Sequence, residues 1–240
     1  MRLAALVLVA LALTACESNQ ERSAQIQKAD RHEVAEAARR QALAERALTI
    51  TKASTKVRVT ATAVVHDSEG AAAVVRLENV SGTSLRDVPI QITVRNARGA
   101  SVYTNAVAGL SPTLASVGLI PAHSVQTWID DQVQATGVPA SVSAKVGEGT
   151  PASAAVPQLS VVGAHLSETQ AEGNVVNHSG VAQQELVVYA VARRGGSIVA
   201  AGRAVLASAP ARTSTPFQIF FVGDPSGAQL EVSAPASGSG

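Results

Sequence analysis

An internal repeat in residues 56–235 constrains the fold of this chain more than any other feature. A shift of 98 residues aligns the segment Val75-X-Leu77-X-Asn79-X-Ser81-Gly82 with Gly173-X-Val175-X-Asn177-X-Ser179-Gly180. The next segment, 87–94 (DVPIQITV), aligns at the same shift with 185–192 (ELVVYAVA), and a shift of 89 aligns 121–128 (PAHSVQTW) with 210–217 (PARTSTPF). Both copies must be able to adopt one fold, so each copy constrains the interpretation of the other.

The composition of both copies predicts an all-β fold. Val, Thr, Ser and Ala dominate from Lys56 onward, and the turn formers Gly, Pro, Asn and Asp recur at short intervals. Short alternating strands with frequent turns are typical of a β-sandwich. We therefore predict two tandem β-sandwich domains at 56–147 and 158–235. A linker at 148–157 joins them, and a flexible tail at 236–240 follows.

The repeat also sets the orientation of a strand that is apolar on both faces. In the first copy, hydrophobic residues alternate with Pro89, Gln91 and Thr93. The aligned core positions of the second copy are Leu186, Val188, Ala190 and Ala192, which leaves Val187, Tyr189 and Val191 on the outer face. Exposed apolar stripes often mark contact surfaces, so these three residues are our candidate partner surface. Alternatively, the predicted helix, the other domain or residues of the same sheet cover them.

The first sixteen residues predict export and a lipid anchor. Leu3 to Ala15 is an apolar run of 13 residues. A membrane-spanning helix needs about 20 residues, so this run is too short to cross a membrane. It fits the apolar part of a secretory signal at 1–15. The run ends in Leu13-Thr14-Ala15-Cys16, which resembles a bacterial lipobox. The resemblance implies a diacylglyceryl group on Cys16 and an extracytoplasmic protein held at the cell membrane, or at an outer membrane if the organism has one.

Residues between this anchor and the repeat are expected to act as a spacer. We predict a flexible tether at 16–29 and a single α-helix at 30–52, since Asp30 with Glu33 resembles a capping box and Ala, Glu, Arg and Leu dominate the segment. The hydrophobic stripe of this helix is thin, because most of its apolar residues are Ala. The helix is therefore either a spacer or a weak coiled-coil or partner-binding element.

Catalytic and metal-binding patterns are missing from the sequence. Cys16 is the single cysteine, so a lipidated chain has no thiol for a disulfide or a metal site. The five histidines show no metal-ligand spacing, and we interpret them as solvated turn residues. We interpret Asp130 and Asp131 likewise as solvated turn carboxylates, and Trp128 and Phe217 as equivalent core residues. We therefore expect neither an enzyme nor a bound cofactor.

The charge balance argues against nucleic acid as a partner. The sequence has 19 basic and 18 acidic residues, and removal of residues 1–15 takes Arg2 away, which leaves the charges balanced. A chain without net positive charge lacks the electrostatic basis of nucleic-acid binding.

The segment 173–180 (GNVVNHSG) carries an Asn-X-Ser sequon and a His-Ser pair, but the repeat favours a structural role. The first copy has the same triplet at Asn79 to Ser81. Asn and Ser side chains can satisfy backbone groups in a turn, and we expect Gly82 and Gly180 to supply positive φ angles there. Adjacent His178 and Ser179 would point to opposite faces of an extended strand, so they do not form a catalytic pair.

Together, the G-X-V-X-N-X-S-G segment, the alternating strand after it and the P-A-X-[ST]-X-X-P-F segment resemble the FxLYD-type domain of bacterial envelope proteins. Residues 158–235 match better than the first copy, which has Trp128 in place of the Phe. The resemblance implies immunoglobulin-like sandwiches and an envelope location, and it brings no catalytic residues. The expected function is a non-catalytic binding or scaffolding module with an envelope protein partner. The alternative is a receptor that binds a small ligand or cell-wall carbohydrate through loops at one end of a sandwich.

Overall fold

The computed structural model describes residues 47–153 and 155–238. The predicted signal peptide, Cys16, the tether and residues 30–46 of the predicted helix lie outside this part of the chain. Residues 47–52, which we predicted as the end of the helix, are not helical, so that boundary is wrong. Within the described ranges, no helix has the length and apolar character needed to cross a membrane.

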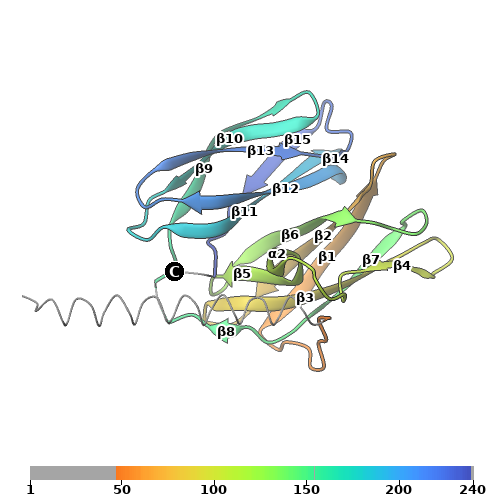
Figure 1. Ribbon diagram of the computed structural model, residues 1–240, viewed down its shortest axis with the longest axis horizontal. Helices are drawn as coiled ribbons and strands as arrows, with labels where there is room; N and C mark the ends of the chain where they lie inside the picture. Colours follow the sequence, from red (N-terminus) through yellow and green to blue (C-terminus); the bar gives the residue numbers. More distant parts are fainter. Residues whose placement is uncertain (1–46, 154, 239–240) are drawn as a thin grey trace, which may run out of the picture. The chain divides into compact units, whose positions relative to one another are not determined.

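The first copy folds into antiparallel strands arranged in two sheets, which confirms the all-β prediction (Figure 1). One sheet has the order β1 (Val57–His66), β2 (Ala71–Asn79), β6 (Val125–Val133). The other is built on β3 (Leu85–Arg95), which pairs with β4 (Ser101–Thr104), β5 (Ser116–Ile120), β7 (Ser141–Val146) and β8 (Thr150–Pro151). The short helix α2 (Pro112–Ala115) leads into β5.

The second copy repeats this plan with fewer interruptions. One sheet has the order β13 (Ser214–Phe220), β10 (Gln170–Asn177), β9 (Leu159–Ser167). The facing sheet has the order β14 (Val222–Gly223), β12 (Ser197–Ala209), β11 (Gln183–Arg194), β15 (Gln229–Ser233). The long strand β12 corresponds to β4 and β5 of the first copy, where the additional residues and α2 divide the strand in two. Equivalent pairs keep the register: Leu85 faces Ile120 on β5, as Gln183 faces Ala209 on β12.

The predicted core faces are confirmed in both copies. Val88, Ile90, Ile92 and Val94 are fully buried on β3, and so are Leu186, Val188, Ala190 and Ala192 on β11. Trp128 and Phe217 are both buried, as expected for equivalent core residues. Four of the histidines are exposed, as predicted, but His66 and His165 lie in strands β1 and β9 and not in turns. His32 lies outside the described residues.

The turn after the repeated Asn-X-Ser triplet is built by buried asparagine side chains. Asn79 and Asn177 are both fully buried. The Nδ2 atom of Asn177 donates to the carbonyl oxygens of Val181 and Ala209 at 2.9 and 3.0 Å, and its Oδ1 accepts from the Ser179 amide at 3.0 Å. Asn79 makes the corresponding bonds in the first copy. The structural role that we predicted for the triplet is therefore confirmed for both copies.

Positive φ angles also recur at equivalent positions, but not where we expected them. They occur at Asp87 and Glu185, with φ of 51° and 47°, and at His123 and Arg212, with φ of 52° and 57°. The aligned glycines Gly99 and Gly196 have φ of 81° and 85°. Gly82 and Gly180 do not adopt positive φ, so our expectation for these two glycines is wrong. The buried asparagine holds this turn without a left-handed residue at either position.

The predicted linker and tail are partly ordered by contacts with the two sandwiches. Strand β8 lies inside the predicted linker 148–157 and pairs with β3, so that Arg86 faces Thr150. Residues 236–238 of the predicted flexible tail also have defined contacts. Ala236 is buried, and the Ser237 amide donates to Oε1 of Gln183 at 3.0 Å. The prediction of a flexible tail is therefore wrong for Ala236 and Ser237, whereas the linker contains a short strand that we did not predict.

Candidate functional site

The candidate partner residues Val187, Tyr189 and Val191 face the first sandwich. Tyr189 and Val191 are each 3% exposed, and both belong to the buried cluster that contains Val75, Leu77 and Trp128 of the first copy. Val187 packs against the same cluster. Of the three alternatives that we named for covering these residues, the structure therefore shows burial against the other domain. The three residues do not form an exposed surface.

Both sheets of this interface have an apolar outer face. In the second copy, Val191 lies beside Ala201 of β12, and Ala201 is fully buried. In the first copy, Val74 of β2 lies beside Ile129 of β6, and both are buried. Because side chains of a strand alternate between faces, Val74 and Ile129 point away from the side occupied by Val75 and Trp128. Figure 1 shows the strands β6 and β2 next to β11 and β12.

A buried ion pair joins the two copies in this interface. Arg203 of β12 and Asp131 of β6 have side chains that are 4% and 16% exposed. The Arg203 Nε atom donates to Oδ1 of Asp131 at 3.1 Å, and the Arg203 backbone amide donates to Oδ2 at 3.0 Å. The guanidinium also donates through Nη1 to Oγ1 of Thr113 at 3.0 Å. Both carboxylate oxygens are therefore satisfied from the other copy, which fixes the position of one sheet against the other.

Arg203 also lies beside Tyr189, because the two residues are register partners on β12 and β11. Burial raises the pKa of the Tyr189 hydroxyl above its ordinary value, and the positive charge of Arg203 acts in the opposite direction. The apolar stripe and the ion pair therefore occupy one continuous surface.

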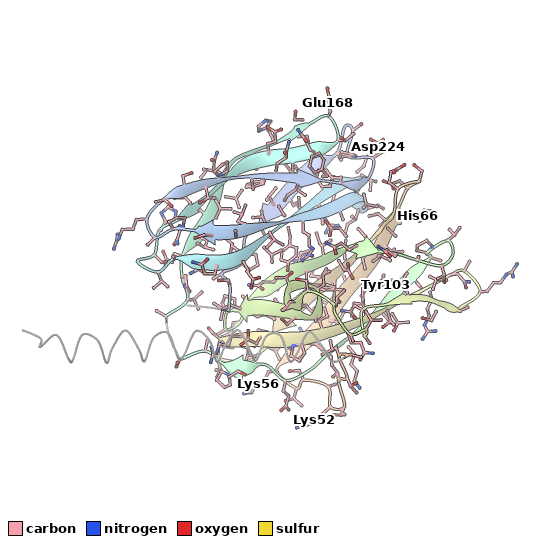
Figure 2. The ribbon with its side chains drawn as sticks, in the orientation of Figure 1. Lys52, Lys56, His66, Tyr103, Glu168 and Asp224 are labelled. Carbon is pink, nitrogen blue, oxygen red and sulfur yellow. The ribbon has the colours of Figure 1, made fainter. Side chains whose placement is uncertain are left out.

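Asp130 is not the solvated turn carboxylate that we predicted. It lies within β6 and is fully buried, and its Oδ2 accepts a hydrogen bond from the Tyr103 hydroxyl at 2.8 Å. The backbone amide of Gln132 donates to Oδ1 at 2.9 Å. Burial raises the pKa of Asp130, and the bonds from Tyr103 and Gln132 oppose that shift. Figure 2 shows Tyr103, which β4 supplies to this buried pair.

A second polar contact joins the copies at the β1–β2 turn, beside the labelled His66 in Figure 2. The backbone amide of Gly223 donates to Oδ2 of Asp67 at 2.7 Å. This bond is the largest cause of the lowered pKa of Asp67. Gly223 has φ of 92°, and a Cβ atom there would lie 2.3 Å from the Val199 carbonyl oxygen. The close approach therefore requires glycine at this position.

An open groove of about 360 Å³ lies at the edge of the interface. The first copy lines it with Arg76, Val125, Gln126 and Thr127, and the second with Glu231, Ser233, Ala234 and Pro235. The Oε1 atom of Gln126 is buried and has no hydrogen-bond partner among the described residues.

Sequence reasoning missed Arg203. It interpreted Asp131 as a solvated turn carboxylate, which is wrong because Asp131 lies in β6 and pairs with Arg203. The only local signal was a single arginine within the apolar run 197–206 (SIVAAGRAVL) of a predicted sheet. A charged residue in such a run indicates a buried pair, but nothing in the sequence identified its partner. In the described ranges, no group of three or more His, Cys, Asp and Glu side chains is arranged to hold a metal ion.

Comparison with known proteins adds no further assignment. No family model matches the chain, and no curated protein sequence matches it.

Proposed function

We propose that this protein is an extracytoplasmic lipoprotein that acts as a non-catalytic binding or scaffolding module of the bacterial cell envelope. The observation that carries the proposal is the segment Leu13-Thr14-Ala15-Cys16 at the end of a 13-residue apolar run. A diacylglyceryl group on Cys16 supplies two acyl chains, which is enough for stable anchoring where one chain is marginal. The resemblance to FxLYD-type domains supports the same location.

The use of buried polar groups supports a structural rather than a catalytic role. Asn79, Asn177, Asp131 and Arg203 have their hydrogen-bonding atoms committed to turns or to the contact between the copies. Groups that are fully engaged in this way stabilise a fixed arrangement and are not free to act on a substrate. A fixed tandem of sandwiches suits a module that presents a surface to a partner.

Fractionation tests the anchor. Wild-type protein and a Cys16→Ala variant are expressed in the native host and separated into membrane and soluble fractions. The proposal expects the wild type in the membrane fraction and the variant released. Ser23→Ala, in the tether, is the matched control and is expected to stay with the membrane. Continued tight membrane association of Cys16→Ala would contradict the anchor.

Site-directed photocrosslinking tests the scaffold. A photoreactive phenylalanine analogue replaces Phe220, whose side chain is 64% exposed, or Tyr189, which is 3% exposed. Envelopes are irradiated, solubilised in detergent and purified through the protein. We expect a reproducible envelope protein crosslinked at exposed positions such as 220, and only intramolecular products at 189. Absence of any envelope protein in a scan of the exposed strand positions would contradict a scaffolding role.

A further inference from the structure

The segment that follows β15 crosses from the second sandwich to the first. The Ser237 amide donates to Oε1 of Gln183 in the second copy at 3.0 Å, and the Ser237 hydroxyl donates to the same atom at 3.3 Å. The next residue, Gly238, lies against Gly118 of β5 and Asp87 of β3, both in the first copy. Residues 234–238, which we call the C-terminal strap, therefore contact both sandwiches.

The contact of the C-terminal strap with the first sandwich is close enough to require glycine on both sides. A Cβ atom at Gly118 would lie 2.9 Å from the Gly238 nitrogen and 3.3 Å from the Ser237 Cα atom. A Cβ atom at Gly238 would lie 2.7 Å from the Gly118 carbonyl oxygen and 2.8 Å from Oδ1 of Asp87. Neither glycine has a positive φ, so close packing of one backbone on the other is the reason for glycine here.

The two copies differ at the positions that the C-terminal strap contacts. Gln183 is fully buried, and its equivalent in the first copy is the buried Leu85. A buried amide without a partner costs free energy, so Gln183 suits this position because Ser237 bonds to it. The equivalent of Gly118 in the second copy is an alanine, Ala207, and that residue is exposed. The glycine and the buried amide therefore coincide with the two ends of the strap contact.

The C-terminal strap joins the same two bodies that bury the apolar stripe. It continues from β15, which pairs with β11, the strand that carries Val187, Tyr189 and Val191. These three residues are covered because the first sandwich lies against them. The strap itself is short and is held by the bonds of Ser237 and the packing of Gly238. Its release is therefore a local event that needs no unfolding of either sandwich.

We propose that the C-terminal strap holds the junction between the sandwiches closed and keeps the stripe of Val187, Tyr189 and Val191 buried. Release of the strap raises the fraction of chains in which the junction is open and the stripe is exposed, because the closed state then loses contacts that the open state lacks. This device goes beyond the scaffolding proposal, and it does not depend on the anchor at Cys16.

Hydrogen exchange measured by NMR on the full-length chain in detergent micelles tests this inference. The Arg203 amide donates to Oδ2 of Asp131 across the junction, so its exchange reports opening of the junction. The Val175 amide lies in the central strand β10 and reports opening of the second sandwich itself. A chain that ends at Pro235 should exchange the Arg203 amide faster than the wild type by about tenfold or more, with the Val175 amide unchanged. Equal exchange of the Arg203 amide in the two chains, or an equal rise at Val175, would overturn the proposal.

Substitutions of the glutamine that binds Ser237 test the same device without shortening the chain. Gln183→Leu supplies the residue of the equivalent position in the first copy and removes the acceptor for Ser237. It should speed exchange of the Arg203 amide as the truncation does. Gln184→Leu changes the exposed neighbouring glutamine and should exchange like the wild type. Equal exchange of the Arg203 amide in these two variants would contradict a role of the Ser237 bonds.

A glycine substitution locates the strap contact on the first sandwich. Gly118→Ala should lower the melting temperature of the full-length chain and have little effect in the chain that ends at Pro235. The reason is that the three atoms nearest to the added Cβ atom all belong to residues 236–238. The same loss in both chains would contradict the contact. The fractionation of Cys16→Ala does not depend on the strap, so a failure of the anchor is distinguishable from a failure of this device.

Discussion

Removal of the Asp131 carboxylate should weaken the contact between the two sandwiches and lower the free energy of unfolding. In the folded chain the Arg203 side chain is 4% exposed, so water cannot replace the lost partner. Asp131→Ala removes the bond from Arg203 Nε at 3.1 Å and the bond from its backbone amide at 3.0 Å. Among the described residues, Thr113 alone then remains as an acceptor for the guanidinium. Breaking a buried pair on one side costs about 3–5 kcal/mol, because it leaves an uncompensated charge. We expect a loss of this size in the free energy of unfolding.

Chemical denaturation with two comparison variants measures this loss. Lys52→Ala breaks an ion pair whose side chains are 73% and 55% exposed, so water replaces the lost partner and the free energy of unfolding should change little. The double variant Asp131→Leu with Arg203→Met replaces both charges by apolar groups and should recover most of the stability that Asp131→Ala loses. A loss for Asp131→Ala as small as that for Lys52→Ala would mean that the Asp131–Arg203 pair behaves as a solvated pair, contrary to this prediction.

Three further predictions concern groups inside the sandwiches. Asn177→Ala leaves several buried backbone groups unpaired, at a cost of about 1–3 kcal/mol each. Urea denaturation should therefore show a loss of about 3 kcal/mol or more in the free energy of unfolding. A loss below about 1 kcal/mol would count against the buried-asparagine turn. Because the raised pKa of Asp130 means that the folded state holds the proton more tightly, the free energy of unfolding should fall as the pH rises from about 4 through the raised pKa. Asp130→Asn should flatten this part of the curve of stability against pH, and an unchanged slope would exclude Asp130 as its source. Gly202→Ala places a Cβ atom 2.2 Å from the Phe220 carbonyl oxygen and should lower the melting temperature. Gly180→Ala is the control, because its Cβ atom meets open space and Gly180 has no positive φ. Equal effects of the two variants on the melting temperature would contradict the close approach at Gly202.

The repeat made most of the fold predictable from sequence. Alignment of 87–94 with 185–192 assigned the core face of a strand that hydrophobicity alone could not orient, and all eight core positions are fully buried. The alignment could orient the strand because side chains alternate along it, so one correctly aligned residue fixes the face of every other residue. The same alignment identified Asn79 and Asn177 as equivalent turn residues.

The contact between the copies was not predictable in the same way. Repetition reports what the two copies share, whereas Tyr189, Asp131 and Arg203 belong to surfaces on which the copies differ. Asp130 and Asp131 were adjacent carboxylates in the sequence, yet they point to opposite faces of β6, one toward Tyr103 and one toward Arg203. Long-range partners of this kind depend on the packing of sheets that sequence periodicity does not specify. The expected end of the helix at 52 failed for a related reason, since tertiary contacts of Ile50 override local propensity.

The stripe and the buried ion pair should join the two sandwiches into one cooperative body. Urea denaturation tests it most directly, with fluorescence of the single tryptophan, Trp128, for the first copy and hydrogen exchange of the β11 amides for the second. Trp128 is fully buried in the first copy, so its emission reports the unfolding of that copy. We expect coincident transitions in the wild type and separated transitions in Asp131→Ala. Separated transitions in the wild type, with the β11 amides exchanging while Trp128 stays buried, would contradict it.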